Sequence, residues 1–173
     1  MSAVVSPAAL RRGMMSPKTW EDAVQEVEGL ADRLGKPIDP LIRPVVSALR
    51  AHGFPTTGSC QGHLSRGHPY PWIEITPPQP TATDPRAAQE EVRRSGILLR
   101  AHLTTFLEGF YSTRPASRHS TRLGFHFFPF GLFRLQSVGA EILPYERTEI
   151  RRARITEYRA EAASFGQYLR AEL

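Results

Sequence analysis

The sequence has 173 residues, of which 40% are hydrophobic and 23% charged, the proportions of a soluble globular protein with one domain. Its formal net charge of +5 favours polyanionic partners. A single cysteine excludes an internal disulfide, and no apolar run reaches the ~18 residues that span a bilayer, so we expect a cytoplasmic protein without a membrane segment. The first 15 residues lack periodicity and are predicted to be disordered, ahead of one domain over residues 16–173.

Four helices are predicted from apolar spacing and from start and stop signals. Three begin at a capping residue followed by proline, at Ser16-Pro17, Asp39-Pro40 and Asp84-Pro85. They end near Gly35, near Gly53 and near residue 112, and a fourth begins at about Tyr145. The side chains expected to face the core are Trp20, Val24, Val27, Ala31 and Leu34, then Leu41, Val45 and Leu49, then Val92, Leu99, Leu103, Phe106 and Phe110, and finally Ile155, Tyr158, Ala162, Phe165 and Leu169.

Two pairs of short strands are predicted between the helices. "PTTGS" and "PWIEI" form the first pair, and "LGFHFFPFGLFRLQSVG" reads as a hairpin broken at residues 129–131. In that hairpin, Phe125 and Phe127 are expected to face the core, with His126 and Phe128 on the other side. The order α-α-β-β-α-β-β-α predicts an α+β fold, with helices packed on one face of an antiparallel or mixed sheet.

The loop "TTGSCQGHLSRGHPY" contains the only cysteine. Gly62 permits a turn that folds His63 back toward Cys60, and a thiol beside an imidazole can become a nucleophilic thiolate. Cys60 is therefore a candidate nucleophile and His63 its base, while Ser59 and the amide of Gly62 would bind an anionic substrate. The alternative is that Cys60 is a small buried hydrophobe and His63 an ordinary turn residue.

A metal site is a second interpretation of the same loop. Cys60, His63 and His68 form a C-x2-H-x4-H series, and Glu74 or His126 could complete a four-ligand shell for zinc or another transition metal. This spacing permits a metal site without being diagnostic of one, because no second cysteine knuckle accompanies it.

The spacing from Cys60 to Arg66 is C-x5-R, which resembles the phosphate-binding loop of low-molecular-weight tyrosine phosphatases, with Gly62 also matching. That resemblance gives Arg66 an anion-binding role. However, such a loop opens a helix, and prolines at 69 and 71 make a helix implausible here. The surroundings of the motif therefore argue against a phosphatase.

The wider pattern is a helix ending in glycine, then T-T-x-S-C-x-G-H, then a strand. It resembles small uncharacterised bacterial and phage proteins that bear an S-C-x-G-H signature. More loosely, it is similar to the wybutosine-synthesis tRNA methyltransferase family, whose signature reads S-S-C-S-G-R. Ser59, Cys60 and Gly62 match that signature, whereas His63 replaces its arginine. The resemblance covers about thirty residues and implies an enzyme that acts on RNA or a nucleotide.

A segment without Asp or Glu runs from residue 109 to 140. It includes the basic loop "STRPASRHSTR" and six phenylalanines, an arrangement typical of single-stranded nucleic-acid binding. Arg114, Arg118 and Arg122 are the candidate phosphate contacts, and Arg122 or His126 is a candidate neighbour of the cysteine site.

The sequence has no Walker loop, dinucleotide fingerprint, S-adenosylmethionine loop or Ser-His-Asp layout, so it indicates no particular cofactor. Our main interpretation is an enzyme, or a substrate-binding protein, with an anionic ligand such as a nucleotide or RNA at "SCQGH". The alternatives are a non-catalytic module that binds nucleic acid or protein, and a metal-binding protein. The sequence leaves the oligomeric state open.

Overall fold

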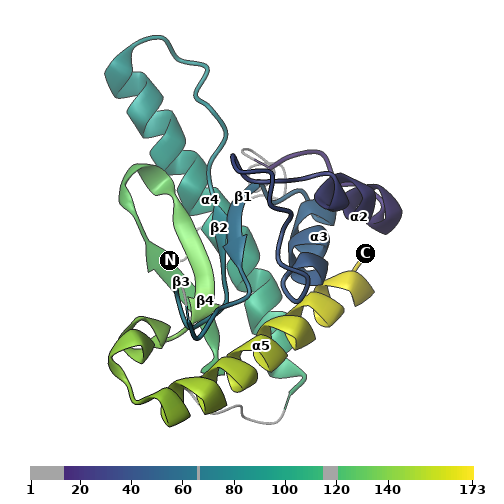
Figure 1. Ribbon diagram of the computed structural model, residues 1–173. Helices are drawn as coiled ribbons and strands as arrows, with labels where there is room; N and C mark the ends of the chain where they lie inside the picture. Colours follow the sequence, from purple (N-terminus) through teal and green to yellow (C-terminus); the bar gives the residue numbers. More distant parts are fainter. Residues whose placement is uncertain (1–13, 66, 115–120) are drawn as a thin grey trace.

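The computed structural model describes residues 14–65, 67–114 and 121–173, which form helices around one sheet (Figure 1). The predicted order of helices and strands and the α+β class are confirmed, with two short 3-10 helices added after β3 and β4. The elements are α2 (Trp20–Glu28), α3 (Arg43–Ala51), β1 (Thr56–Cys60), β2 (Trp72–Ile75), α4 (Pro85–Ser112), β3 (Leu123–Phe127), η2 (Pro129–Gly131), β4 (Phe133–Ser137), η3 (Ala140–Tyr145) and α5 (Thr148–Ala171).

The four strands form an antiparallel sheet in the order β1-β2-β4-β3. β1 and β3 are therefore its two edges, and Cys60 lies at the end of one of them, opposite Trp72. On the face away from the core, Glu74 is opposite Arg134, which is in turn opposite His126. Glu74 and Arg134 form an ion pair of 3.1 Å, and the guanidinium of Arg134 lies 3.9 Å from the centre of the Trp72 ring.

The other face of the sheet packs against α3, α4 and α5 (Figure 1). Alternation along β2 and β4 directs Ile73, Ile75, Phe133 and Leu135 toward these helices, and all four are buried. Burial of this apolar surface is the main stabilising contribution to the fold. The helices contribute Val45, Val46, Leu49, Leu99, Leu103, Phe110, Ala162, Phe165 and Leu169 to the same core.

The long helix α4 begins where the sequence predicts. The carboxylate of Asp84 accepts the backbone N–H of Ala87 at 2.8 Å, and Pro85 occupies the first turn. The first turns of α4 project past the sheet in Figure 1, and the tip of the β3–β4 hairpin packs against the helix. Gly96 permits this close approach, because a Cβ there would lie 2.6 Å from the carbonyl oxygen of Gly131.

The predicted start of the first helix at Ser16 is wrong. The backbone N–H of Met15 donates to the carbonyl of Gly53 at 2.8 Å, which holds this segment extended along the end of α3. The helix starts only after Thr19, whose hydroxyl accepts a backbone N–H of the first turn at 3.1 Å. Most of the predicted disordered segment, residues 1–13, lies outside the described residues.

The same helix ends earlier than predicted, at Glu28 instead of near Gly35. The carboxylate of Asp32 accepts the backbone N–H groups of Leu34 and Lys36 at 2.8 and 2.9 Å, forming a local turn that competes with helix. Leu34, which was expected to face the core, is consequently exposed.

The second helix begins at Arg43, four residues after the predicted start at Asp39. Val45 and Leu49 are buried as predicted, but Leu41 precedes the helix and is exposed. The cause lies in Asp39, whose carboxylate bonds to the β1–β2 loop described below and does not cap the helix.

The C-terminal half of the fold follows the prediction with two changes. The last helix begins at Thr148 because η3 occupies residues 140–145, while its five predicted core residues are all buried. Phe125 packs on Phe133 at a ring distance of 5.3 Å, but Phe127 is 58% exposed. Phe127 ends an edge strand, where α4 presents the guanidinium of Arg100 to its ring at 4.7 Å.

Candidate functional site

Three side chains from separate segments meet where β1 ends. Cys60 is the last residue of β1, His63 lies in the following loop, and Asp39 precedes α3. The cysteine sulfur, a ring nitrogen of His63 and a carboxylate oxygen of Asp39 all lie within 4.8 Å of one another. His63 Nε2 is 3.0 Å from Asp39 Oδ2, and these two side chains are 19% and 27% exposed. The Asp39–Cys60–His63 cluster is therefore partly buried and reachable from solvent.

The turn between Cys60 and His63 depends on Gly62. Its backbone has φ = 81°, and a Cβ there would lie 2.8 Å from the carbonyl carbon of Tyr70. The N–H of Gly62 donates to the cysteine sulfur at 3.3 Å, and the N–H of His63 donates to the carbonyl of His68 at 2.9 Å. Glycine is thus needed for both its conformation and its size.

Two longer-range contacts fix the same turn. Arg159 of α5 donates to the carbonyl oxygens of Gln61 and Gly62 at 2.9 and 2.6 Å. Gln61 also joins the turn to the segment before α3, since its N–H donates to Asp39 at 3.2 Å and its side-chain oxygen accepts the N–H of Leu41 at 3.1 Å. The backbone of the turn is therefore held from two sides of the fold.

The electrostatics of the cluster favour a protonated thiol in the free protein. Burial raises the pKa of Cys60, and the neighbouring carboxylate of Asp39 raises it further. The N–H of Gly62, whose effect is second only to that of burial, and the weaker influence of the Arg159 charge lower this pKa without cancelling the rise. A cysteine nucleophile needs the reverse direction, because the thiolate is the reactive form.

The structure brings Cys60 and His63 together, as the sequence of the loop predicted, and Gly62 forms the turn between them. It does not bring His68, the predicted third metal ligand, to the cluster. The backbone carbonyl of His68 accepts the N–H of His63, while the centre of its ring lies 5.1 Å from that of the Tyr70 ring. Ser59 lies on β1 and lines a pocket that also includes Asp39.

The other predicted ligands are also held elsewhere. Glu74 is engaged by Arg134 on the open face of the sheet. His126 lies on β3, at the edge opposite Cys60, with its ring 4.9 Å from that of Phe128. Neither residue completes a shell around Cys60 and His63.

The predicted nucleic-acid contacts are engaged within the fold where the structure describes them. Arg114 pairs with buried Glu161 at 3.0 Å, and the guanidinium of Arg122 lies 4.3 Å from the centre of the Tyr111 ring. Arg122 also precedes β3 and so lies away from Cys60. Two further predicted residues, Arg66 and Arg118, lie outside the described residues.

Asp39 is the cluster member that sequence reasoning missed as a site residue. An Asp-Pro pair before an apolar periodic segment is a standard helix start, so Asp39 was interpreted only as a helix cap. Its real partners are 22 and 24 positions away, at Gln61 and His63. No local pattern indicates such a contact.

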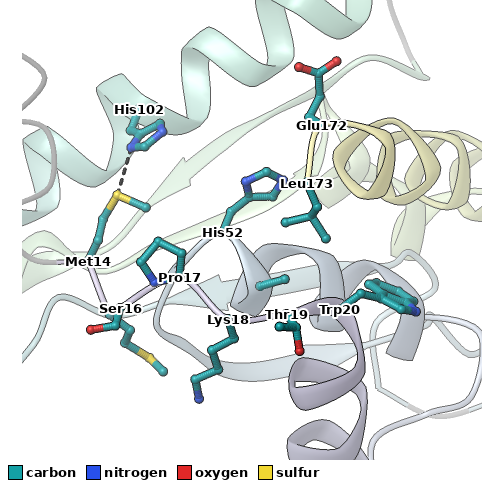
Figure 2. A pocket seen from close by; sticks show the side chains of 12 residues that line it. Met14, Ser16, Pro17, Lys18, Thr19, Trp20, His52, His102, Glu172 and Leu173 are labelled. Carbon is teal, nitrogen blue, oxygen red and sulfur yellow. Dashed lines mark hydrogen bonds between the residues drawn. The ribbon is translucent and has the colours of Figure 1, made fainter.

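A further cavity lies apart from the cluster. It measures about 920 Å³ and lies between the segment before α2 and the C-terminal residues (Figure 2). In Figure 2, His102 of α4 faces Met14, with 2.8 Å between Nδ1 and Sδ, and His52 lies nearby. The ring nitrogen of His52 is 2.7 Å from the carbonyl of Leu169, so both histidines have partners inside the fold.

Comparison with family models, with curated proteins and with solved structures finds no match to this chain. None of the described helices is both long enough and apolar enough to cross a membrane.

Proposed function

We propose that the protein binds a transition metal ion, with zinc favoured, through Asp39, Cys60 and His63. The supporting observation is the convergence of a sulfur, a ring nitrogen and a carboxylate oxygen within 4.8 Å. Zinc binds these three atom types at about 2.0–2.3 Å, so small side-chain rotations would allow all three to reach one ion. Thiolate and imidazole together select zinc-like ions over magnesium and calcium, which prefer oxygen ligands.

The surrounding contacts support such a site. The N–H of Gly62 that donates to the sulfur, and the guanidinium of Arg159 that fixes the turn, are outer contacts of the kind that orient metal ligands. On binding, the Cys60 S–H bond breaks, the sulfur–metal bond forms and the proton passes to solvent. To bind the ion, His63 Nε2 would need a free lone pair, so the neutral ring would carry its proton on Nδ1 and the hydrogen bond to Asp39 would be replaced by the bond to the ion.

A cysteine nucleophile is less well supported by the same geometry. Its thiol would have to ionise beside a carboxylate, and burial opposes this further by raising the pKa of Cys60. A bound cation would favour the ionised thiol in spite of burial and the neighbouring carboxylate, because it compensates the charges of the thiolate and the carboxylate. That the protein is an enzyme acting on RNA or a nucleotide stays a prediction.

The test is metal analysis of the purified full-length protein, followed by competition between the protein and a chelator for zinc. We expect about one ion per chain. We expect His63→Ala and Asp39→Asn to weaken zinc binding by at least about 100-fold, because each removes a direct ligand. Cobalt substitution should add a thiolate-to-metal charge-transfer band, which Cys60→Ser abolishes.

His68→Ala is the matched control, since this histidine belongs to the same loop but not to the cluster. It should retain the affinity of the parent protein. Circular dichroism of each variant separates loss of a ligand from loss of folding. Saturable zinc binding that survives His63→Ala, or an equal loss in His68→Ala, would contradict the proposed ligand set.

A further inference from the structure

A pocket of about 550 Å³ adjoins the cluster, and Asp39 lies in its wall. Residues 56–59 of β1 form one side, and the segment around residues 30–39 forms the other. This volume is in the range of pockets that hold small molecules. A molecule in this pocket would therefore lie next to one of the three proposed metal ligands.

The charged side chains that line this pocket differ in how far they are already engaged by partners within the fold. The carboxylate of Asp32 accepts two N–H groups of its own turn, and Arg50 is held by Glu26 at 2.6 Å. Lys36 supplies a further positive charge from an exposed position on the same wall. Ser59, on the strand that ends in Cys60, adds a hydroxyl donor.

The proposed ion needs more than the cluster provides. Among the residues that the structure describes, the cluster has three ligands, whereas zinc in proteins takes four. Sites with three protein ligands receive water or a substrate atom in the fourth position. One thiolate and one carboxylate compensate the charge of a divalent ion, so attraction of an anion would depend on nearby cations such as Lys36.

We propose that this pocket binds a small oxyanion, a carboxylate or a phosphate, and that one of its oxygens occupies the fourth position of the ion. This inference rests on the proposed function and specifies the ligand class of the same site. Lys36 and the hydroxyl of Ser59 recognise the rest of the anion. The step forms a metal–oxygen bond and displaces a bound water, with no covalent change in the anion.

The test uses the full-length protein loaded with cobalt, whose visible bands report on its coordination. Inorganic phosphate and acetate are titrated in separate arms, which distinguishes the two oxyanion classes. We expect at least one of them to shift the bands saturably. Lys36→Met should lower the affinity for that anion by about tenfold without changing cobalt affinity, because it removes one positive charge from the pocket wall.

Arg33→Met is the matched control, because Arg33 lies on the same segment but is not among the residues that line the pocket. It should leave anion affinity unchanged. Cobalt bands that neither anion alters would overturn this inference and leave the proposed function standing. An equal loss in Lys36→Met and Arg33→Met would overturn the pocket as the binding site. Failure to bind cobalt at all would overturn the proposed function, and this inference with it.

Discussion

Replacement of Glu26 by glutamine tests how the first two helices are held against the strand that carries the cluster. Glu26 of α2 binds Arg50 of α3 at 2.6 Å and Lys18 at 2.7 Å. The same arginine is buried and donates to the carbonyl of Thr56, the first residue of β1, at 2.9 Å. Loss of the carboxylate therefore weakens a contact chain that connects α2, α3 and β1.

The magnitude follows from the pKa of Glu26, which its hydrogen bonds, chiefly from Arg50, lower from 4.5 to about 2. At roughly 1.4 kcal/mol for each pH unit, this difference corresponds to about 3 kcal/mol. The Glu26 side chain is 28% exposed, so solvent screening reduces the contribution to about 1–2 kcal/mol. We expect Glu26→Gln to lower the free energy of unfolding at pH 7 by that amount.

The pH dependence has a definite sign. A carboxyl group whose pKa is lowered in the folded state stabilises the protein above its unfolded pKa, and this stabilisation is lost as the pH falls through the folded value. The difference between the parent protein and Glu26→Gln should therefore be constant from pH 7 to about 5, and should shrink as the pH falls from there toward 2. Urea unfolding followed by tryptophan fluorescence at a series of pH values measures it.

Glu90→Gln provides the control, since Glu90 pairs with Arg93 at 2.7 Å on the surface of α4. Both side chains of this pair are largely exposed, so we expect a much smaller change than for Glu26→Gln. Equal effects of the two substitutions, or a Glu26→Gln difference as large at pH 3 as at pH 7, would refute the assigned role of the Glu26–Arg50 contact.

Two further substitutions test packing and buried polar groups. Gly62→Ala should lower the free energy of unfolding by more than about 2 kcal/mol and weaken zinc binding, because the new Cβ meets the backbone of Tyr70. Gly67→Ala, also at positive φ but with no neighbour within 4 Å, should cost only about 1 kcal/mol, and a similar cost for both would contradict the steric argument. Tyr111→Phe should cost about 1–3 kcal/mol in urea unfolding, because its hydroxyl donates to a buried carboxylate at 2.8 Å and accepts the backbone N–H that begins β3 at 2.7 Å. Tyr145→Phe, at an exposed position, should change nothing, and equal effects would argue against the buried network.

The predictable part of the fold is the part with local causes. In α4, the Asp84-Pro85 start and the apolar stripe through Leu99 and Leu103 indicate the same helix, and its observed bounds agree with them. The hairpin-like strand pairs likewise favoured an antiparallel or mixed sheet, and the observed sheet is antiparallel. The errors occurred where a side chain competed with the helical backbone, as at Asp32, whose local turn ends the apolar periodicity before Leu34.

Only part of the Asp39–Cys60–His63 cluster could be predicted from the sequence. Cys60 and His63 could be paired because a glycine turn joins them, so their proximity has a local cause. Asp39 reaches them only because α3 packs beside β1, which is a property of the tertiary fold. The spacing that made His68 a candidate ligand says nothing of where its ring points, and in the structure that ring packs on Tyr70.

The contact between Arg159 and the turn has a consequence for biosynthesis. Ninety-seven positions separate this arginine from Gly62, so the turn emerges from the ribosome well before the side chain that fastens it. A nascent or truncated chain without α5 would present the cysteine in a loosely held loop. Full affinity for the proposed ion would thus be acquired only after α5 has been synthesised and has packed against the turn.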